Sequence, residues 1–378
     1  MFRIKTYLIL ISLFILHNVF GTAVVSAVGS DVQFEAEIIA VIKQEERVSL
    51  ETKHMYQELE LLGISGKYNG KKIRVESGTL PVAGVPLYQR GQKVVVNESI
   101  YPDGTKNLII VDFVRRDALY TLFLAFIIVS LLVARRRAIG SLLGLGISFF
   151  VIFSFVLPRI LAGDNPVLIA VLAGCIVVPL TYYISHGWSN KTHIAVLGTL
   201  IALLITGLIS YWAIESAQLT GYSSEEVSFL QGVIKSPVNM KALILAGIII
   251  GLFGILDDVT ISQASIVEKL HEVSPGLSPH TLYIKAMDVG KDHIASVINT
   301  LILVYTGAAL PFLLLFVSSS TGFHTALNFE IIAEEIIKML TSSIGLILAV
   351  PITTFLAVLL KSRLVQRSNK STGRLFSH

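Results

Sequence analysis

Long apolar stretches, each close to the length of one bilayer crossing, constrain the fold of this chain more than any other feature. There are seven, at residues 117–134, 138–157, 167–186, 193–214, 240–257, 293–317 and 340–360. About 20 helical residues cross the hydrocarbon core of a bilayer. Charged residues make up only 15% of the chain, against about 25% in soluble domains. The sequence therefore predicts a polytopic α-helical membrane protein with seven spans over residues 117–360.

The amino terminus has the pattern of an export signal. Arg3 and Lys5 precede a short apolar segment at residues 7–16, and Val25-Ser26-Ala27 is similar to a small-residue cleavage site. We predict that residues 1–27 are a signal peptide. The alternative is an uncleaved amino-terminal anchor. In both cases the segment that follows is exported.

Residues 28–116 have a different composition, with equal numbers of basic and acidic side chains, so they do not form a polybasic arm for nucleic acid. Phe34, Ala36, Ile38, Ala40 and Ile42 alternate with other residues, a period of two that indicates a strand. We predict five strands, near 32–42, 56–64, 71–77, 92–98 and 107–113. A small extracytoplasmic β-barrel of the OB or SH3 type would hide the strand edges.

Two turns punctuate this predicted barrel. Asn69-Gly70 is a signal for a two-residue type I′ hairpin, because both residues accept the positive φ that this turn needs. Pro102-Asp103-Gly104 is a second turn signal.

Basic residues set the expected direction of the spans. With the barrel outside, 12 Lys or Arg residues fall in the inner loops and the tail, and four fall in the short outer loops. The tail at residues 361–378 is thus expected in the cytoplasm. The inner segment 259–292 is predicted to be a helical hairpin. Ser265 and Glu268 have capping-box spacing, and Ser278-Pro279 has the pattern of a helix start.

Small residues and prolines mark expected helix contacts. Gly247, Gly251 and Gly254 share one helix face, and Gly140 and Gly144 repeat the spacing on the second span. Such stripes allow a neighbouring helix to approach closely. The expected kinks lie at Pro311 and Pro351.

Polar residues inside or beside the fifth and sixth spans form a candidate ion or proton site. Carboxylates at the carboxyl end of a helix oppose its dipole, so Asp257-Asp258 either caps a following helix or binds a cation or proton at a broken helix. His293 is the side chain that most readily changes charge near neutral pH, although an interfacial histidine can also simply cap or snorkel. The candidate set is Asp257, Asp258, Asp288, Asp292, His293, Asn299 and Thr300.

The sequence lacks the signature motifs of several enzyme classes. The sequence contains no phosphate-binding G-x-x-x-x-G-K-[ST] loop, no H-E-x-x-H and no G-x-S-x-G. Its single cysteine, Cys175, excludes a disulfide framework and a cysteine-based metal site. We expect no cofactor and no catalytic residue, while the sequence leaves open whether a metal ion binds.

Three strings combine these features, at residues 251–265, 285–294 and 350–353. They read Gly-Leu-Phe-Gly-Ile-Leu-Asp-Asp-Val-Thr-Ile-Ser-Gln-Ala-Ser, Lys-Ala-Met-Asp-Val-Gly-Lys-Asp-His-Ile and Val-Pro-Ile-Thr. With them, the chain from residue 110 to residue 361 resembles the YibE/F family of bacterial multi-pass membrane proteins. The resemblance implies a protein of the bacterial cell membrane. It supplies no substrate and no catalytic residue.

The sequence supports two hypotheses about function, from different classes. A third, an intramembrane enzyme, ranks behind both. The first is a proton- or cation-coupled secondary transporter of unknown substrate, which polar residues within spans favour. The alternative is a non-transporting assembly or scaffold factor whose exported barrel binds an envelope partner. The expected partners are the lipid bilayer, an envelope or protein partner of the barrel, and a second copy of the chain. Nucleic acid is not expected.

Overall fold

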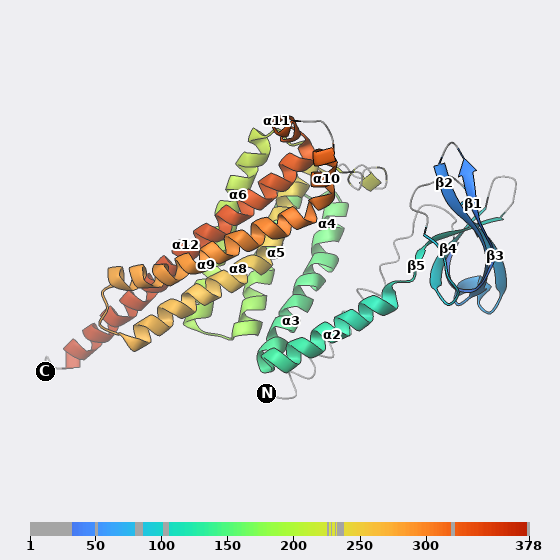
Figure 1. The fold of residues 1–378 in the computed structure, drawn as a ribbon. Coiled ribbons are helices and arrows are strands. Elements are labelled where there is room, and N and C mark those ends of the chain that lie inside the picture. Colours follow the sequence, from blue (N-terminus) through green and yellow to red (C-terminus); the bar gives the residue numbers. More distant parts are fainter. Residues whose placement is uncertain are drawn as a thin grey trace. The chain divides into compact units, whose positions relative to one another are not determined.

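The computed structural model describes residues 32–49, 52–79, 86–100, 106–224, 227, 229–230, 232, 238–318 and 322–375. The predicted signal peptide and the predicted turn at residues 102–104 lie outside these ranges. The described residues fall into two compact units divided between Val133 and Ala134, and Figure 1 shows the elements of each.

The first unit contains a five-stranded antiparallel sheet, which confirms the five predicted strands. Its strands are β1 (Val32–Ser49), β2 (Thr52–Gly63), β3 (Lys72–Ser77), β4 (Lys93–Ile100) and β5 (Lys106–Phe113). Their order is β3-β2-β1-β4-β5, because the long β1 pairs with β2 along most of its length and with β4 near its start. The inward-facing Phe34, Ala36 and Ile38 pack with apolar residues of β2, β3 and β4 to form the core.

The turn predicted at Asn69-Gly70 is of a different type. Eight residues separate β2 from β3, and they include the single-turn 3₁₀ helix η1 (Gly66–Tyr68). Asn69 has φ −55° and ψ 125°, and only Gly70 has a positive φ, of 73°. The Lys71 amide donates to the Tyr68 carbonyl at 2.9 Å. These angles define a type II turn, which needs positive φ at its second central residue alone. The type I′ hairpin prediction was therefore wrong.

Six helices are long and apolar enough to span a membrane, and a bent pair makes a seventh if it is one span. The six stretches are α2 (Arg116–Ala134), α3 to α4 (Arg136–Leu161), α5 (Pro166–His186), α6 (Asn190–Ser216), α8 (Met240–Val273) and the Glu330–Ser362 part of α12 (Glu330–Leu375). The pair is α9 (Pro279–Ala308) with α10 (Leu310–Ser318), bent by 69°. One turn of π-helix, η2 (Ile152–Val156), interrupts the second stretch between α3 (Arg136–Val151) and α4 (Leu157–Leu161). Six of the seven predicted spans are thus continuous or nearly continuous helical stretches, and the predicted span at residues 293–317 falls on the bent pair α9 and α10.

The second unit is a helical bundle. Helices α6, α8 and α12 contact one another, α9 packs on α8 and α12, and α5 packs on α6, α8 and α3. Small residues permit close crossings of α6 with α12, since a Cβ on Gly198 would lie 2.4 Å from the Thr353 Oγ1 atom. The apolar core of the bundle is centred on α8, whose Leu252, Leu256 and Val267 are fully buried.

The predicted hairpin over residues 259–292 consists of the end of α8 and the start of α9, but the predictions at Asp257-Asp258 and Ser265 fail because α8 continues past its apolar stretch. Helix α8 runs without a break through Asp257-Asp258 and ends at Val273, so Ser265 is inside the helix and caps nothing. Hydropathy marks only the apolar section of a helix, whereas backbone hydrogen bonding and tertiary packing carry α8 for a further 16 residues, from Asp258 to its end at Val273. The start of the next helix is as predicted, because the Ser278 side chain accepts from the Thr281 amide.

The two prolines behave differently from each other. Helix α12 continues through Pro351, so this proline does not break the helix. Pro311 lies directly after the bend between α9 and α10, where a proline is tolerated because the first turn of a helix has free N–H groups.

Candidate functional site

The two glycine stripes have different surroundings. A Cβ built on Gly140 would lie 2.9 Å from the Ser185 Cα atom, and one on Gly144 would lie 3.3 Å from the Ser185 Oγ atom. Gly140 and Gly144 therefore face α5 closely. Gly247, Gly251 and Gly254 are exposed, and a Cβ on any of them would meet no atom within 4 Å in the part of the chain that the structure describes. Among the described residues, no other helix therefore approaches this second stripe closely.

Asp257 faces α5, and its partner there is a histidine that the sequence did not single out. The His186 Nε2 atom lies 3.4 Å from the Asp257 Oδ1 atom. The two side chains are 32% and 30% exposed. The Oδ1 atom itself is inaccessible to water and accepts no hydrogen bond from the described residues. His186 is the last residue of α5, and a helix carboxyl end favours a cation. The position thus suits a basic side chain beside the carboxylate.

A buried group of hydroxyls involves Tyr182, one turn before His186 on α5, Thr260, one turn after Asp257 on α8, and Thr199 of α6. The Tyr182 hydroxyl is hydrogen bonded to the Oγ1 atoms of Thr199 and Thr260, at 2.5 Å and 3.0 Å, and these two atoms are 2.9 Å apart. All three residues are fully buried. Because polar groups without partners are costly in a membrane, these contacts satisfy one another and fix α5, α6 and α8 together beside the Asp257–His186 pair.

Gln263 makes a second interhelical contact. Its Nε2 atom donates to the Ala286 carbonyl at 2.9 Å and to the Thr354 Oγ1 atom at 2.7 Å. The amide therefore ties α8 to α9 and α12. Gly290 lies beside it, because a Cβ there would come within 3.1 Å of the amide atoms.

Two adjoining cavities meet at the Asp257–His186 pair. The first has a volume of about 850 Å³ and a mostly polar and charged lining from α3, α5, α6 and α8, which includes His186. The second has a volume of about 300 Å³ and a mostly apolar lining from α3, α5 and α8, which includes Asp257. Ser141 and Ser185 line both. The pair of titratable side chains thus lies between a charged cavity and an apolar groove.

The other predicted site residues do not join this pair. Asp258, Asp288, Asp292, Asn299 and Thr300 are exposed. Asp288 forms an ion pair with Lys291 at 3.0 Å, and the Thr300 hydroxyl donates to the Ser296 carbonyl at 3.1 Å.

His293 is half-buried, and its inaccessible Nε2 atom has no hydrogen-bond partner among the described residues. It lies on α9, which meets α8 through Ala286, whereas Asp257 faces α5. In the part of the chain that the structure describes, no group of three or more His, Cys, Asp or Glu side chains is placed to hold a metal ion.

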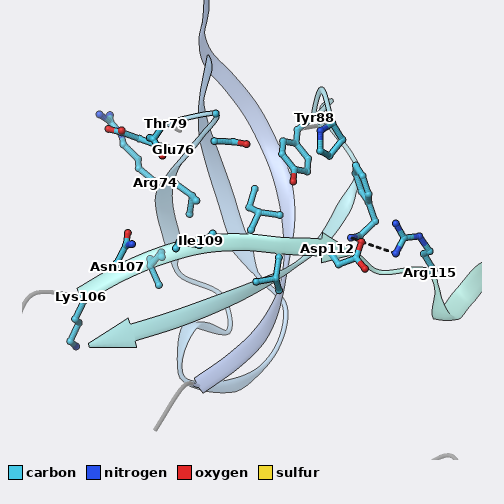
Figure 2. Close-up of a pocket in the computed structure, with 17 residues that line it drawn as sticks. Arg74, Glu76, Thr79, Tyr88, Lys106, Asn107, Ile109, Asp112 and Arg115 are labelled. Carbon is cyan, nitrogen blue, oxygen red and sulfur yellow. Dashed lines mark hydrogen bonds and ion pairs between the residues drawn. The ribbon is translucent and has the colours of Figure 1, made fainter. Parts of the chain in front are cut away.

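A separate cavity lies in the sheet unit. Figure 2 shows it between the two edge strands, β3 and β5, with Tyr88 at one end and Lys106 at the other. Its volume is about 970 Å³, and its lining includes every residue of β5. Arg115 and Asp112 form an ion pair at 2.6 Å at its rim.

Comparison with known proteins decides the family. The sequence model for YibE/F-like protein matches residues 122–363. The chain belongs to the YibE/F-like family. The family match contains Asp257, His186 and both bundle cavities, whereas the sheet of this YibE/F-like protein lies before it. No curated protein matches the chain, and no solved structure matches it.

Proposed function

We propose that this YibE/F-like protein is a proton-coupled secondary transporter of the bacterial cell membrane, and that Asp257 and His186 carry the coupling proton. The observation that carries the proposal is their 3.4 Å contact between two cavities of different polarity. Ionisable residues within membrane helices are costly, and they mark ion or proton pathways by default.

The geometry supports a shared proton. With both groups charged, the imidazolium compensates the carboxylate whose buried oxygen accepts no hydrogen bond from the described residues. With a proton on the carboxyl group, the two side chains are neutral and no longer attract strongly. Movement of this proton therefore changes the electrostatic attraction between α5 and α8. Such a two-state contact is what alternating access requires.

The test compares Asp257 with its neighbour. We would follow the pH inside liposomes that contain purified protein, under an imposed pH gradient, and the carboxyl infrared band as a function of pH. Asp257→Asn and His186→Gln should abolish or shift the titrating band and the proton flux, whereas the control Asp258→Asn alters an adjacent exposed carboxylate and should leave both unchanged. A titration that is identical in wild type and all three variants would exclude the site.

The groove in the sheet unit favours a second candidate, a scaffold factor that binds an envelope partner. Here we propose that the sheet lies outside the cell. We also propose that it closes as an OB-type barrel, since β1 pairs with both β2 and β4 and the edge strands β3 and β5 approach each other. The groove between these edges is its binding surface.

A photo-crosslinking residue tests this second candidate in cells. Placed at Ile109, which is 46% exposed and lines the groove, it should give a discrete crosslinked product. Placed at Val48, which is 67% exposed and outside the groove, it should not. Equal products from both positions would mean that the groove selects no partner.

A further inference from the structure

The two adjoining bundle cavities together have the polarity of an amphiphile. The larger one is lined by charged side chains and by four serines, Ser141, Ser185, Ser262 and Ser265. The smaller one is lined mainly by apolar side chains, among them Leu145, Phe149 and Phe253. They share Ser141 and Ser185, so one molecule can occupy both with a polar end and an apolar end.

The charges of the larger cavity favour an anion. Arg137, Lys191 and Lys269 line it together with Glu268 and Glu272, and these five side chains sum to a net charge of +1 with His186 left out of the count. Glu268 is already compensated, with the Lys191 and Lys361 ammonium groups at 4.0 Å and 3.6 Å. Among the residues that the structure describes, Arg137 and Lys269 form no ion pair with a carboxylate. Arg135 and Arg136 precede Arg137 directly and add to the positive field.

The place of the cavity in the fold favours a lipid over a free anion. It lies where α3 begins, α5 ends and α6 begins, which is one end of three apolar stretches. That end is the boundary between hydrocarbon and headgroups when these helices span a bilayer. The apolar groove runs from the charged cavity along α8 to Gly254. A Cβ at Gly254 would meet no described atom within 4 Å, so the groove is open there.

We propose that this site binds an anionic phospholipid, with its phosphate in the charged cavity and the start of one acyl chain in the groove of α3, α5 and α8. Arginine and lysine bind phosphate oxygens with charge-assisted hydrogen bonds, and serine hydroxyls add neutral donors. Basic pockets between membrane helices bind anionic headgroups on the same principle. The inference does not depend on transport, because lipid binding is measured without any proton flux.

The experiment measures lipid affinity of the full-length protein directly. Purified protein in detergent would be titrated with phosphatidylglycerol and with phosphatidylcholine of the same acyl chains, and bound lipid counted by native mass spectrometry. Each basic residue near an anionic lipid contributes about fivefold in affinity. We therefore expect Arg137→Gln and Lys269→Gln each to lower the affinity for phosphatidylglycerol about fivefold. Lys285→Gln, an exposed lysine of α9 outside the cavity, is the matched control and should change nothing.

A second variant tests the groove. Gly254→Leu places an isobutyl group at the groove, and its Cβ would meet no atom of the described chain within 4 Å. Gly254→Leu should lower the affinity for phosphatidylglycerol severalfold. Gly247→Leu, on the same exposed face but outside the groove, should leave this affinity unchanged.

Three results would overturn the proposal. The first is equal affinity for phosphatidylglycerol and phosphatidylcholine. The second is equal behaviour of Arg137→Gln, Lys269→Gln and Lys285→Gln. The third is tight binding of soluble glycerol 3-phosphate that displaces the lipid and is insensitive to Gly254→Leu, which would assign the cavity to a free phosphate compound.

Discussion

At the scale of single residues, two carboxylates with water-inaccessible oxygen atoms lie beside basic side chains. Asp257 of the bundle lies beside His186. In the sheet unit, Glu98 is only 1% exposed, and it forms ion pairs with Lys67 of the 3₁₀ helix and with Lys106, the latter at 3.7 Å. Removing the basic partner leaves a carboxylate oxygen that is inaccessible to water without a compensating charge. Both pairs are therefore sensitive positions for substitution.

Glu98 should make the stability of the sheet unit depend on pH. The hydrogen bond from Lys67 lowers the pKa of the Glu98 carboxyl by more than burial raises it. A lowered folded-state pKa stabilises the fold above the unfolded-state value, near pH 4.3, and this stabilisation disappears as the pH falls through the folded-state pKa. We expect Glu98→Gln to speed amide hydrogen exchange in β1 and β4 at pH 7. The ratio of variant to wild-type exchange should approach one at pH 3, and a ratio independent of pH would contradict the pairing.

At the scale of elements, close crossings in the bundle follow from small residues only where a neighbouring helix is present. The α3–α5 crossing depends on Gly140 and Gly144, whereas the stripe on α8 faces open space. The same spacing of glycines thus has two different roles in one chain. A stripe predicts that a close approach is sterically allowed, but the topology decides whether a helix arrives there.

Substitution of one glycine from each stripe should separate these roles. In Gly140→Ala the new methyl group would lie 2.9 Å and 3.0 Å from backbone atoms of Ser185 and Ile184. Overpacking of this kind costs about 1–3 kcal/mol, so we expect a lower midpoint of thermal unfolding in detergent. Gly251→Ala meets nothing within 4 Å and should be neutral, or stabilising by up to about 1 kcal/mol from helix propensity. The reverse order of the two midpoints would refute the observed crossing.

At the scale of the whole molecule, the chain combines a small antiparallel sheet with a bundle of apolar helices in two compact units. The family match covers the bundle and begins within α2. The proposed transport and lipid sites lie wholly in the bundle, and the proposed partner groove lies wholly in the sheet unit. Partner binding can therefore be altered without touching the transport and lipid sites, whereas these two sites share His186 and Asp257.

The direction of the chain across the membrane is the prediction that belongs to this scale. In a Cys175→Ser background, we expect a cysteine at position 48 to react with an impermeant maleimide on intact cells. A cysteine at position 371, in the basic tail, should react only after lysis, because basic residues are retained on the inner side. The native Cys175 must be removed since it is exposed. Labelling of position 48 only after lysis would reverse the assigned direction.

The sequence by itself determined the apolar stretches, the five strands, the Ser278 helix start and the family. These depend on local patterns, because the hydropathy of a span, the alternation of a strand and the cap of a helix are properties of neighbouring residues. Only the tertiary structure decided that α8 continues through Asp257, that its glycine stripe is open, and that His186 rather than His293 faces the carboxylate. His186 and Asp257 are 71 positions apart in the sequence. The packing of α5 on α8 brings them together, and no local pattern encodes which helices meet.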